Sequence, residues 1–447
     1  MRIFGSLGMA IPEILLPAEG LDLQKWAVIA CDQYTSEPEY WKRVEELVGE
    51  APSTLHLIYP EVYLNSPDKE ARIARIQAAM KDYLGRGLFR EVSGMIYVER
   101  ETAHGWRRGL LFCLDLEAYD YNPRASSLIR ATEGTIIERI PPRVKIREGA
   151  VLEVPHIMIL IDDPGHLVIG PAADHSRELS KLYEFELMFN SGRLRGFLVD
   201  RTEVERMVMD GLSRLASPEE FQKKYGLPER TPLLLFAVGD GNHSLATAKT
   251  IWERTKAAAR NPEDLKNSPL RYALVEVVNL HDESLVFEPI HRVLFEVRRP
   301  DNLVPNLVEF FNGRVELREH HDFEEMKQAV NARRNQEQIA GLVGQNSFQS
   351  IRFLQPKHNL TVGSLQAFLD DYLKKKEASG LDYVHGDDSL LNLSRQKPGN
   401  LGFYLPAMDK CQLFPTVILD GALPRKTFSM GEAWEKRFYL EARKLTG

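Results

Sequence analysis

The segment Gly239–Ser244 combines an acid, a histidine and a hydroxyl with two glycines spaced one residue apart (Gly-Asp-Gly-Asn-His-Ser). Asp240 could ligate or orient a divalent cation, and His243 could move a proton. Gly239 and Gly241 suit a place where a side chain would block a ligand or where the backbone takes a positive φ. This composition is typical of a turn that holds an anion, most often a phosphate, and equally of a turn with a purely structural role.

A buried strand and a helix are expected on either side of this turn. Leu233–Val238 is a run of six apolar residues, and residues 245–252 begin a helix that Asn242 or Ser244 would cap. The unpaired N–H groups of the first helical turn would attract an anion at the end of the sheet. One helix N-terminus contributes only about 0.3–1 kcal/mol, so other residues have to converge on the ligand. The segment lacks the Gly-Lys-Ser/Thr of a Walker A loop and the third glycine of a dinucleotide-binding turn.

A second group of polar residues lies between positions 130 and 143, around one glycine and ahead of two prolines. Arginines of this kind bind phosphate or carboxylate through paired hydrogen bonds, and an acid beside them could act as a base or a metal ligand. The same composition also suits a solvated loop held by salt bridges. The residues concerned are Arg130, Thr132, Glu133, Thr135, Arg139 and Arg143.

Three further positions are candidates for ligand binding. A late loop carries Arg425, Lys426 and Thr427, whose cations and hydroxyl suit phosphate oxygens but also suit a charged surface turn. His291 and Arg292 stand in an otherwise apolar segment, where a substrate contact and a hydrogen-bonded core histidine are both consistent with the spacing. Asp32 follows the buried run from Trp26 to Ala30, again at the end of an expected strand, and is a candidate substrate contact.

Composition indicates a soluble globular enzyme. The 447 residues are 43% hydrophobic and 27% charged, with a formal net charge of -7, which excludes a broadly basic nucleic-acid binder. Cys31, Cys113 and Cys411 lie far apart, which favours a reducing cytoplasm and excludes a disulfide framework. No apolar run is long enough to cross a membrane, so no membrane partner is expected. The oligomeric state stays open, a homodimer included.

The pattern of elements predicts an α+β fold, or an α/β fold with a mixed sheet. The expected parts are an N-terminal α/β part (1–120), a core with the phosphate or nucleotide site (121–300) and a C-terminal α/β part (301–447) that closes the site. Helices are expected over residues 38–48, 68–84, 176–189 and 202–215, and β-hairpins over residues 95–116 and 155–169.

Taken together, these clusters resemble the family known as domain-of-unknown-function family 1015. The resemblance rests on five segments in order along almost the whole chain, and each matches a family motif. They are Cys31–Tyr34, Thr132–Thr135 with the distal Arg143, Asp240–Ser244, His291–Val293 and Pro424–Thr427. One position departs from the family pattern: Ser244 stands where the family's Asp-Gly-His-His-Arg turn ends in arginine.

The turn of that family is also similar to the phosphate-binding box of the ParB/sulfiredoxin-like superfamily, which includes free-serine kinases. The resemblance therefore implies a ParB/sulfiredoxin-like core and phosphoryl chemistry on a small metabolite, with serine or phosphoserine as a first guess. The implied cofactors are Mg²⁺ at Asp240 and ATP or ADP. His243 or Glu133 would be the general base, and the arginines and Lys426 would neutralise charge. A phosphatase using the same pocket and a non-catalytic sensor of a nucleotide or phosphometabolite remain as alternatives, and the missing arginine favours both over a kinase.

Overall fold

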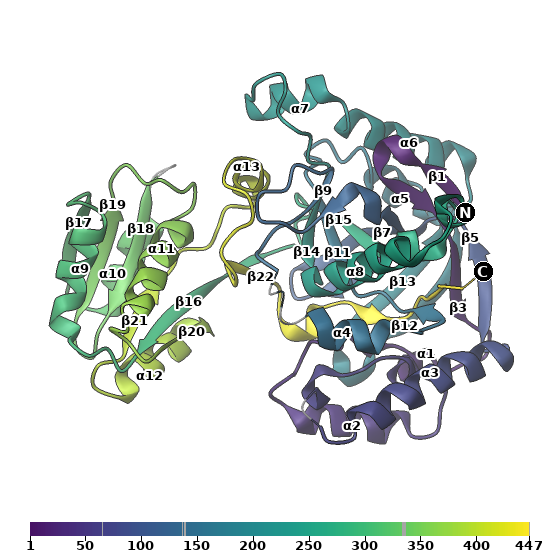
Figure 1. Ribbon diagram of the computed structural model, residues 1–447, viewed down its shortest axis with the longest axis horizontal. Helices are drawn as coiled ribbons and strands as arrows, with labels where there is room; N and C mark the ends of the chain where they lie inside the picture. The colour runs from purple at the N-terminus through teal and green to yellow at the C-terminus, as the bar shows by residue number, and fades with distance from the viewer. Residues whose placement is uncertain (65, 136, 138–139, 333–336, 447) are drawn as a thin grey trace. The chain divides into compact units, whose positions relative to one another are not determined.

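The computed structural model describes residues 1–64, 66–135, 137, 140–332 and 337–446. The chain forms two compact units, the first of Met1–Val286 with Gly431–Gly447 and the second of Phe287–Met430 (Figure 1). The second unit is thus an insertion in the sequence of the first, and Gly431 N donates to Val286 O at 3.3 Å where the chain leaves and returns. Residues 1–286, which the sequence divides into two parts, lie in one unit, and the tail from Gly431 rejoins it.

The first unit is built on a large mixed sheet, which confirms the predicted fold class. Its strands are β1 (Arg2–Phe4), β2 (Met9–Ile11), β3 (Glu13–Pro17), β4 (Val28–Ile29), β5 (Phe89–Ser93), β6 (Ile96–Thr102), β7 (Gly105–Asp115), β8 (Tyr119–Asp120), β9 (Ile129–Ala131), β10 (Leu152–Glu153), β11 (Met158–Ile161), β12 (Ser180–Glu186), β13 (Arg193–Leu198), β14 (Phe236–Asp240), β15 (Tyr272–Asn279), β23 (Phe438–Tyr439) and β24 (Arg443–Lys444). Its helices are α1 (Leu23–Trp26), α2 (Pro38–Val48), α3 (Lys69–Gly85), α4 (Ile140–Arg147), α5 (Gly170–Asp174), α6 (Thr202–Leu215), α7 (Pro218–Tyr225) and α8 (Asn242–Ala258).

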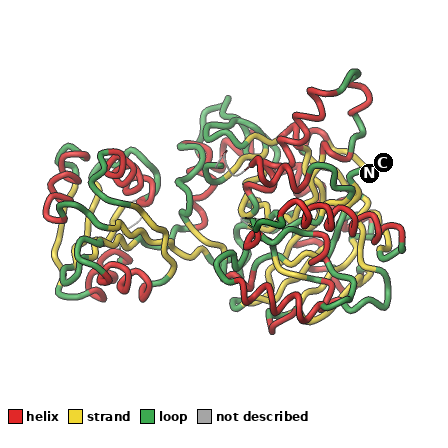
Figure 2. Tube along the Cα trace, turned by 60° about the horizontal axis from the view of Figure 1, so that its bottom comes forward, coloured by secondary structure: helices red, strands yellow, loops and turns green. Residues whose placement is uncertain are grey.

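The order of strands in this sheet is β12-β13-β6-β7-β15-β11-β14-β9-β8, with β2 added beside β7 and β1 beside β2. The pairs β11–β15, β14–β9 and β8–β9 are parallel, and the other pairs along this path are antiparallel. Strand β7 shows why both faces of the sheet are covered. Its alternate residues Leu111 and Cys113 join one apolar cluster with α2 and α3, while Leu110 and Phe112 join another with α6 and α8. Helices accordingly lie outside the strands (Figure 2).

Two expected elements of the first unit are wrong. Residues 176–189 were expected to form a helix, but Ser180–Glu186 is strand β12, because Glu184 and Glu186 are exposed and alternate with the less exposed Tyr183 and Phe185. Residues 166–169 do not form the second strand of a hairpin. There, Asp163 Oδ2 accepts a hydrogen bond from Val168 N at 2.8 Å, and the chain turns into α5. The helices expected at 38–48 and 202–215 and the hairpin of β6 and β7 are confirmed.

The C-terminal tail is held inside the first unit by buried arginines and acids. Arg100 and Arg107 donate to the carbonyls of Trp434 and Glu435 at 2.8 and 2.9 Å. Arg437 pairs with Glu276 and, at 2.5 Å, with Glu441; all three side chains are buried. Buried charges are tolerated only when paired, so this network fixes the path of the tail. Strand β23 then pairs with β4.

The second unit is an antiparallel sheet covered by helices. Its strands are β16 (Phe287–Phe295), β17 (Val315–His320), β18 (Gln338–Val343), β19 (Phe348–Phe353), β20 (Gly380–His385), β21 (Leu401–Tyr404) and β22 (Phe428–Met430). Its helices are α9 (Leu303–Phe310), α10 (Phe323–Asn331), α11 (Thr361–Lys374), α12 (Asp387–Gln396) and α13 (Leu413–Leu419). The strand order is β17-β19-β18-β21-β16-β20, with β22 beside β16.

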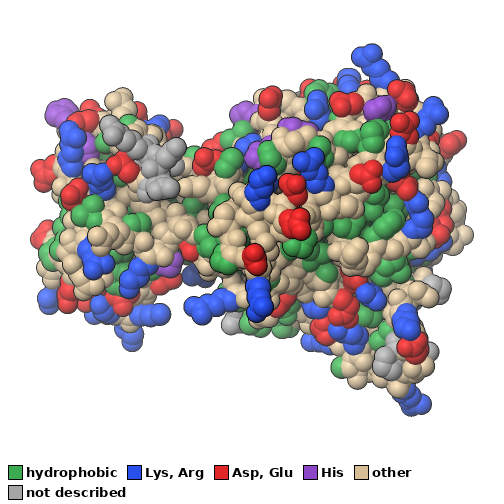
Figure 3. Space-filling model, turned by 90° about the horizontal axis from the view of Figure 1, so that it is seen from above, with side chains coloured by type: hydrophobic (Ala, Val, Ile, Leu, Met, Phe, Trp, Pro, Cys, Tyr) green, Lys and Arg blue, Asp and Glu red, His purple; other side chains and the backbone are tan. Residues whose placement is uncertain are grey.

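The surface carries both signs of charge. Acidic and basic side chains are interspersed on the face seen in Figure 3. Among the described residues, every helix is too short or too polar to span a lipid bilayer.

Candidate functional site

The turn between β14 and α8 has the strand–turn–helix form that the sequence predicts. The helix cap differs from the expectation, because Gly241 occupies the N-cap with φ +80° and neither Asn242 nor Ser244 does. Gly241 has no side chain with which to cap this end of α8, and no acid lies in the first turn of the helix. Asp240, directly before the N-cap, places one carboxylate at the positive end of the helix dipole.

The segment that follows β9 lies beside this turn. Strands β9 and β14 are parallel, with Ala131 opposite Val238, so their carboxyl ends meet at the same edge of the sheet. Thr132 Oγ1 donates to Val238 O at 2.6 Å, which fixes the chain as it leaves β9. Glu133 and Thr135 follow directly, and the hydroxyl of Thr135 is buried without a hydrogen-bond partner. The two segments singled out in the sequence are thus neighbours.

The predicted arginines do not gather at the turn as a group. The guanidinium of Arg130 donates to the carbonyls of Ser127 and Pro232, both at 2.8 Å, and so ties together the loops before β9 and β14. Arg143 on α4 forms an ion pair with Glu61. Arg139 lies outside the described residues. Arg130 is therefore part of the scaffold, and its side chain is engaged at the end of the strands opposite Asp240.

Lys436, which the sequence reasoning missed, supplies a cation at the turn. Its Nζ lies 3.3 Å from Asp240 Oδ2, and the two side chains are 10% and 26% exposed. Gly241 N donates to Asp240 Oδ1 at 2.8 Å. Burial alone would raise the pKa of Asp240, but Lys436, His156 and this hydrogen bond hold it below its ordinary value. Asp240 is therefore a carboxylate at neutral pH and is accessible to solvent.

His156 is a second residue that the sequence did not reveal, and it contacts the first turn of α8. Its Nε2 lies 3.0 Å from Ser244 Oγ and 4.0 Å from Asp32 Oδ2. Its Nδ1 lies 2.9 Å from the hydroxyl of Tyr439. The hydroxyl of Tyr439 in turn accepts a hydrogen bond from Cys31 N at 3.1 Å. We call Asp32, His156, Asp240, Ser244, Lys436 and Tyr439 the Asp240 cluster.

Two long-range strand pairings assemble this cluster. Pairing of β11 with β14 places Met158 opposite Asp240, and His156 comes just before β11. Pairing of β4 with β23 brings Asp32, two residues beyond Ala30, close to Tyr439. In the sequence around Lys436, one pattern could have indicated that this segment is packed. Lys436 and Arg437 directly precede the aromatic pair Phe438-Tyr439, which is unusual for a solvated segment.

Glu61 and Cys31 border the cluster. Glu61 N donates to Cys31 O at 2.8 Å, and its carboxylate pairs with Arg143. Burial raises the pKa of Glu61, Asp32 adds to the rise, and Arg143 opposes it. Burial also raises the pKa of the Cys31 thiol, with Asp32 and Glu61 adding to it, so this cysteine is not an activated thiolate.

The remaining predicted residues lie in the second unit. His291 is buried; its Nδ1 accepts from Leu405 N at 3.1 Å, and its Nε2 lies 3.4 Å from Asp387. The buried guanidinium of Arg292 donates to Gln366 Oε1 at 3.1 Å and to Arg425 O at 3.2 Å. Both side chains are thus engaged within their own unit. The loop with Arg425, Lys426 and Thr427 precedes β22.

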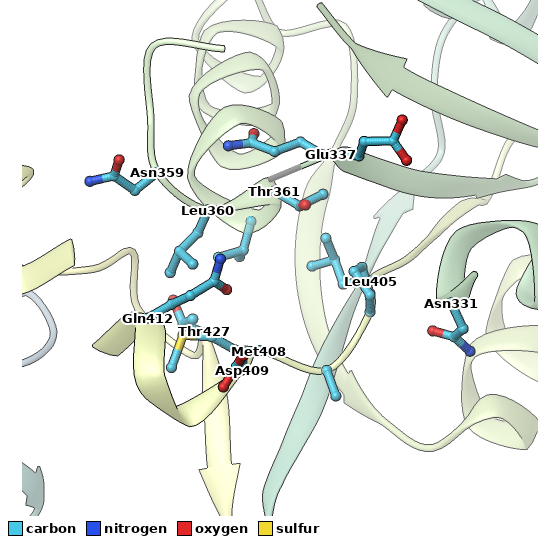
Figure 4. Close-up of a pocket in the computed structure, with 14 residues that line it drawn as sticks. Asn331, Glu337, Asn359, Leu360, Thr361, Leu405, Met408, Asp409, Gln412 and Thr427 are labelled. Atoms are coloured by element: carbon cyan, nitrogen blue, oxygen red, sulfur yellow. The ribbon is translucent and has the colours of Figure 1, made fainter. Parts of the chain in front are cut away.

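A cavity of about 370 Å³ also lies in the second unit. Residues at the start of α11 line one side of it, and Met408, Asp409 and Gln412 line the other (Figure 4). Thr427 borders the cavity, where its hydroxyl donates to Pro424 O at 2.6 Å. Glu337 and Asp409 contribute carboxylates, and no lysine or arginine lines the cavity among the described residues. Its charge therefore suits a neutral or cationic compound better than a phosphate.

Comparison with protein families shows to which family the chain belongs. Residues 15–372 match the family described as "Protein of unknown function (DUF1015)". The chain belongs to the DUF1015 family. The matched stretch contains Asp32, His156, Asp240 and Ser244, whereas Lys436 and Tyr439 lie beyond it. No curated protein matches this DUF1015 chain.

Solved structures resemble this DUF1015 chain only distantly. A conserved hypothetical protein from Pyrococcus furiosus is 10% identical with a TM-score of 0.36, over 75% of this chain and 95% of that one. A free serine kinase in complex with AMP is 10% identical with a TM-score of 0.39, over 75% and 92%. SbnI from Staphylococcus aureus, with a C-terminal truncation, is 9% identical with a TM-score of 0.34, over 72% and 82%. The ParB/sulfiredoxin-like character of the turn stays a prediction.

The DUF1015 chain offers few ligands for a resident metal. Among the described residues, no group of three or more His, Cys, Asp or Glu side chains is placed to hold a metal ion. Mg²⁺ usually takes one or two carboxylates and completes its shell with water and substrate phosphates. Asp240, ionised and accessible, could supply one such ligand. The Asp240 cluster therefore joins an ionised acid, a lysine, an imidazole and a hydroxyl at a helix N-terminus without a side-chain cap.

Proposed function

We propose that this protein transfers a phosphoryl group between a nucleotide and a small hydroxylated metabolite of the serine type, and that the Asp240 cluster is the site. The observation that carries the proposal is the position of Lys436 beside Asp240, at the glycine turn from which α8 begins. Phosphoryl transfer needs little covalent help from a protein and depends mainly on positioning and on neutralising charge. A lysine and the N–H groups of the first helical turn would supply that neutralisation.

In this proposal each group has a defined role. The backbone from Gly239 to His243 binds the phosphate oxygens, and Lys436 takes the charge-neutralising role that the family resemblance implies for the arginines and Lys426. Asp240 orients Lys436 or ligates Mg²⁺ through its accessible carboxylate. When bound, Mg²⁺ would neutralise charge on the phosphates. Asp32 binds the metabolite.

The general base is one of three groups near the turn. Glu133 and His243 were proposed from the sequence, and His156 joins them because its Nε2 lies 3.0 Å from a hydroxyl of the first helical turn. Single variants Glu133→Gln, His243→Gln and His156→Gln separate them. The variant that lacks the base loses about 10²–10⁴-fold in turnover and the corresponding limb of its pH–rate profile.

A phosphorus NMR time course tests the function directly. The protein is mixed with ATP or ADP, Mg²⁺ and free serine, and in parallel with other small hydroxylated amino acids. Appearance of a phosphomonoester signal with loss of the terminal nucleotide phosphate supports the proposal. Unchanged spectra with every donor and acceptor would contradict it, provided that the protein is folded by circular dichroism.

A phosphatase acting on phosphoserine or a similar ester is the second candidate, because Ser244 replaces the arginine that would clamp a nucleotide phosphate. Phosphorus NMR also distinguishes a phosphatase from a kinase, since a phosphatase would release inorganic phosphate from phosphoserine alone. A third outcome, stabilisation against heat by a nucleotide or a phosphometabolite with no turnover of any of them, would indicate a sensor without catalytic activity.

A further inference from the structure

The hydroxyl of Ser244 has the surroundings of a nucleophile rather than of a helix cap. It lies in the first turn of α8 without capping the helix, and His156 Nε2 is 3.0 Å away. A hydroxyl at this distance from an imidazole is the geometry by which a histidine takes the proton of an attacking serine. The chain departs from the family motif at this same position.

The other ring nitrogen of His156, Nδ1, also has a hydrogen-bonding partner. His156 Nδ1 lies 2.9 Å from the buried hydroxyl of Tyr439, and the rings meet edge to face with centroids 5.4 Å apart. The hydroxyl of Tyr439 accepts from Cys31 N at 3.1 Å and also contacts the Cys31 thiol. When its proton points to the thiol, the tyrosine oxygen accepts the Nδ1 proton and Nε2 is left free to act as a base. Tyr439 therefore fixes the orientation of the ring, as the third member of a nucleophile–base–orienter set does, and with its own proton directed to the thiol it also selects the tautomer.

Two carboxylates lie near the imidazole of His156. Asp32 Oδ2 lies 4.0 Å from the same Nε2 that faces Ser244, and Asp240 interacts electrostatically with His156. In the proposed transfer, these carboxylates lie beside the ring that receives the serine proton. Lys436, beside Asp240, and the first turn of α8 can stabilise negative charge on an incoming phosphate.

We propose that Ser244 is the nucleophile of a two-step transfer and carries the phosphoryl group as phosphoserine; this inference rests on the proposed function. In the first step Ser244 Oγ forms a bond to phosphorus, the bond from phosphorus to the leaving oxygen of the donor breaks, and the serine proton moves to His156 Nε2. His156 then passes this proton to the leaving product or to water, so that the imidazole is neutral again before the second step. In the second step the acceptor hydroxyl, or water, attacks the phosphoserine and gives its proton to His156. The Oγ–phosphorus bond then breaks, and Ser244 regains a proton from the same imidazole.

The experiment follows a labelled phosphate onto the full-length protein. Terminally labelled ATP or ADP with Mg²⁺ is mixed with the protein without an acceptor, the reaction is quenched in acid, and the labelled peptide is identified by mass spectrometry. Wild type is expected to take up label at Ser244. His156→Gln should slow labelling about 10²–10⁴-fold, and Ser244→Ala should abolish it. Thr250→Ala is the matched control, because this α8 hydroxyl only bonds to Ala246 O within the helix and should label as wild type does.

Stereochemistry gives a readout that does not depend on any variant. Two in-line displacements on a chiral phosphate give overall retention of configuration at phosphorus, whereas direct transfer gives inversion. Turnover by NMR with inversion, or turnover with no label and an active Ser244→Ala variant, would overturn this inference and leave the proposed function standing. Neither turnover nor label with any donor would overturn both. Label confined to Ser244 without transfer to an acceptor would support the nucleophile and contradict the proposed transferase.

Discussion

Lys436 Nζ lies 3.3 Å from Asp240 Oδ2, although the whole second unit stands between these residues in the sequence. The tail that carries Lys436 is fixed by Arg100 and Arg107, which bond to the carbonyls of Trp434 and Glu435. The candidate site is therefore complete only when the chain has returned from the second unit to the first. A protein that ends before Gly431 would keep the turn but would lack its cation.

Replacing Lys436 by Met should weaken phosphate binding and catalysis together. Loss of one charge-stabilising group at a phosphate site lowers kcat/KM by about 10²–10³-fold. Lys436→Arg should retain part of the activity because it keeps the charge. The measurement is initial rate by phosphorus NMR or a coupled assay, with thermal unfolding as the check on folding.

Lys444→Met is the matched control for this change. Lys444 belongs to the same tail but pairs with Glu91 at the surface, at 2.9 Å with both side chains about half exposed. A surface pair contributes about 0–1 kcal/mol, so this variant should keep wild-type kinetics. Equal losses in Lys436→Met and Lys444→Met would show that the tail matters for stability rather than for the site.

Replacing Asp240 by Asn should abolish turnover and leave the fold intact. The amide oxygen can still accept the hydrogen bond from Gly241 N, but the charge that orients Lys436 or Mg²⁺ is gone. We expect a loss of at least about 10²-fold in kcat and an unchanged circular dichroism spectrum. The exposed Asp210→Asn on α6 serves as the control. Wild-type rates in Asp240→Asn would remove Asp240 from the mechanism.

The strand and helix on either side of Asp240 could be predicted because their signals are local. Six apolar residues, a glycine turn and a helical pattern place the end of β14 within two residues and the start of α8 within three residues of the observed bounds. The segment with Thr132 and the glycine turn were both chosen from the sequence, and in the structure they are neighbours. The parallel pairing of β9 and β14 that brings them together is not visible in the sequence.

His156 and Tyr439 could not be predicted, because pairing between distant strands brings them to the site. Nothing in the residues around position 156 indicates that β11 lies antiparallel to β14. The direction in which a side chain points is equally hidden: Arg130 has the chemistry of a phosphate ligand, yet its guanidinium bonds to loop carbonyls. Sequence patterns identify residue types that can do chemistry, whereas tertiary contacts decide which of them meet.

Replacing Gly241 by Ala should destabilise the turn for two reasons. Its φ of +80° strains a residue with a side chain, and an added Cβ would lie 3.1 Å from Ile157 Cα. The strain costs about 1–3 kcal/mol, and the contact would move the start of α8 relative to β11. Gly226→Ala is the control, because Gly226 has φ +63° but open space around it. Urea unfolding should show a larger loss of unfolding free energy for Gly241→Ala than for Gly226→Ala. Equal losses would mean that Ile157 moves aside without any loss of stability.

The stability of the second unit should fall between pH 6.5 and pH 4 because of His291. Burial lowers the pKa of His291 to about 4, although Asp387 opposes this effect. An unfolded histidine has a pKa of about 6.5, so as the pH falls below 6.5 the unfolded state takes up a proton that the folded state refuses. The loss grows to roughly 3 kcal/mol near pH 4 and then levels off.

The variant His291→Asn, whose amide oxygen can still accept from Leu405 N, should not show this loss of stability. Amide hydrogen exchange of β16 and β20 peptides, compared between wild type and His291→Asn at pH 7 and pH 4.5, measures the difference. If wild type and His291→Asn differ in protection by the same amount at pH 7 and at pH 4.5, then His291 takes up its proton in the folded state as readily as in the unfolded chain.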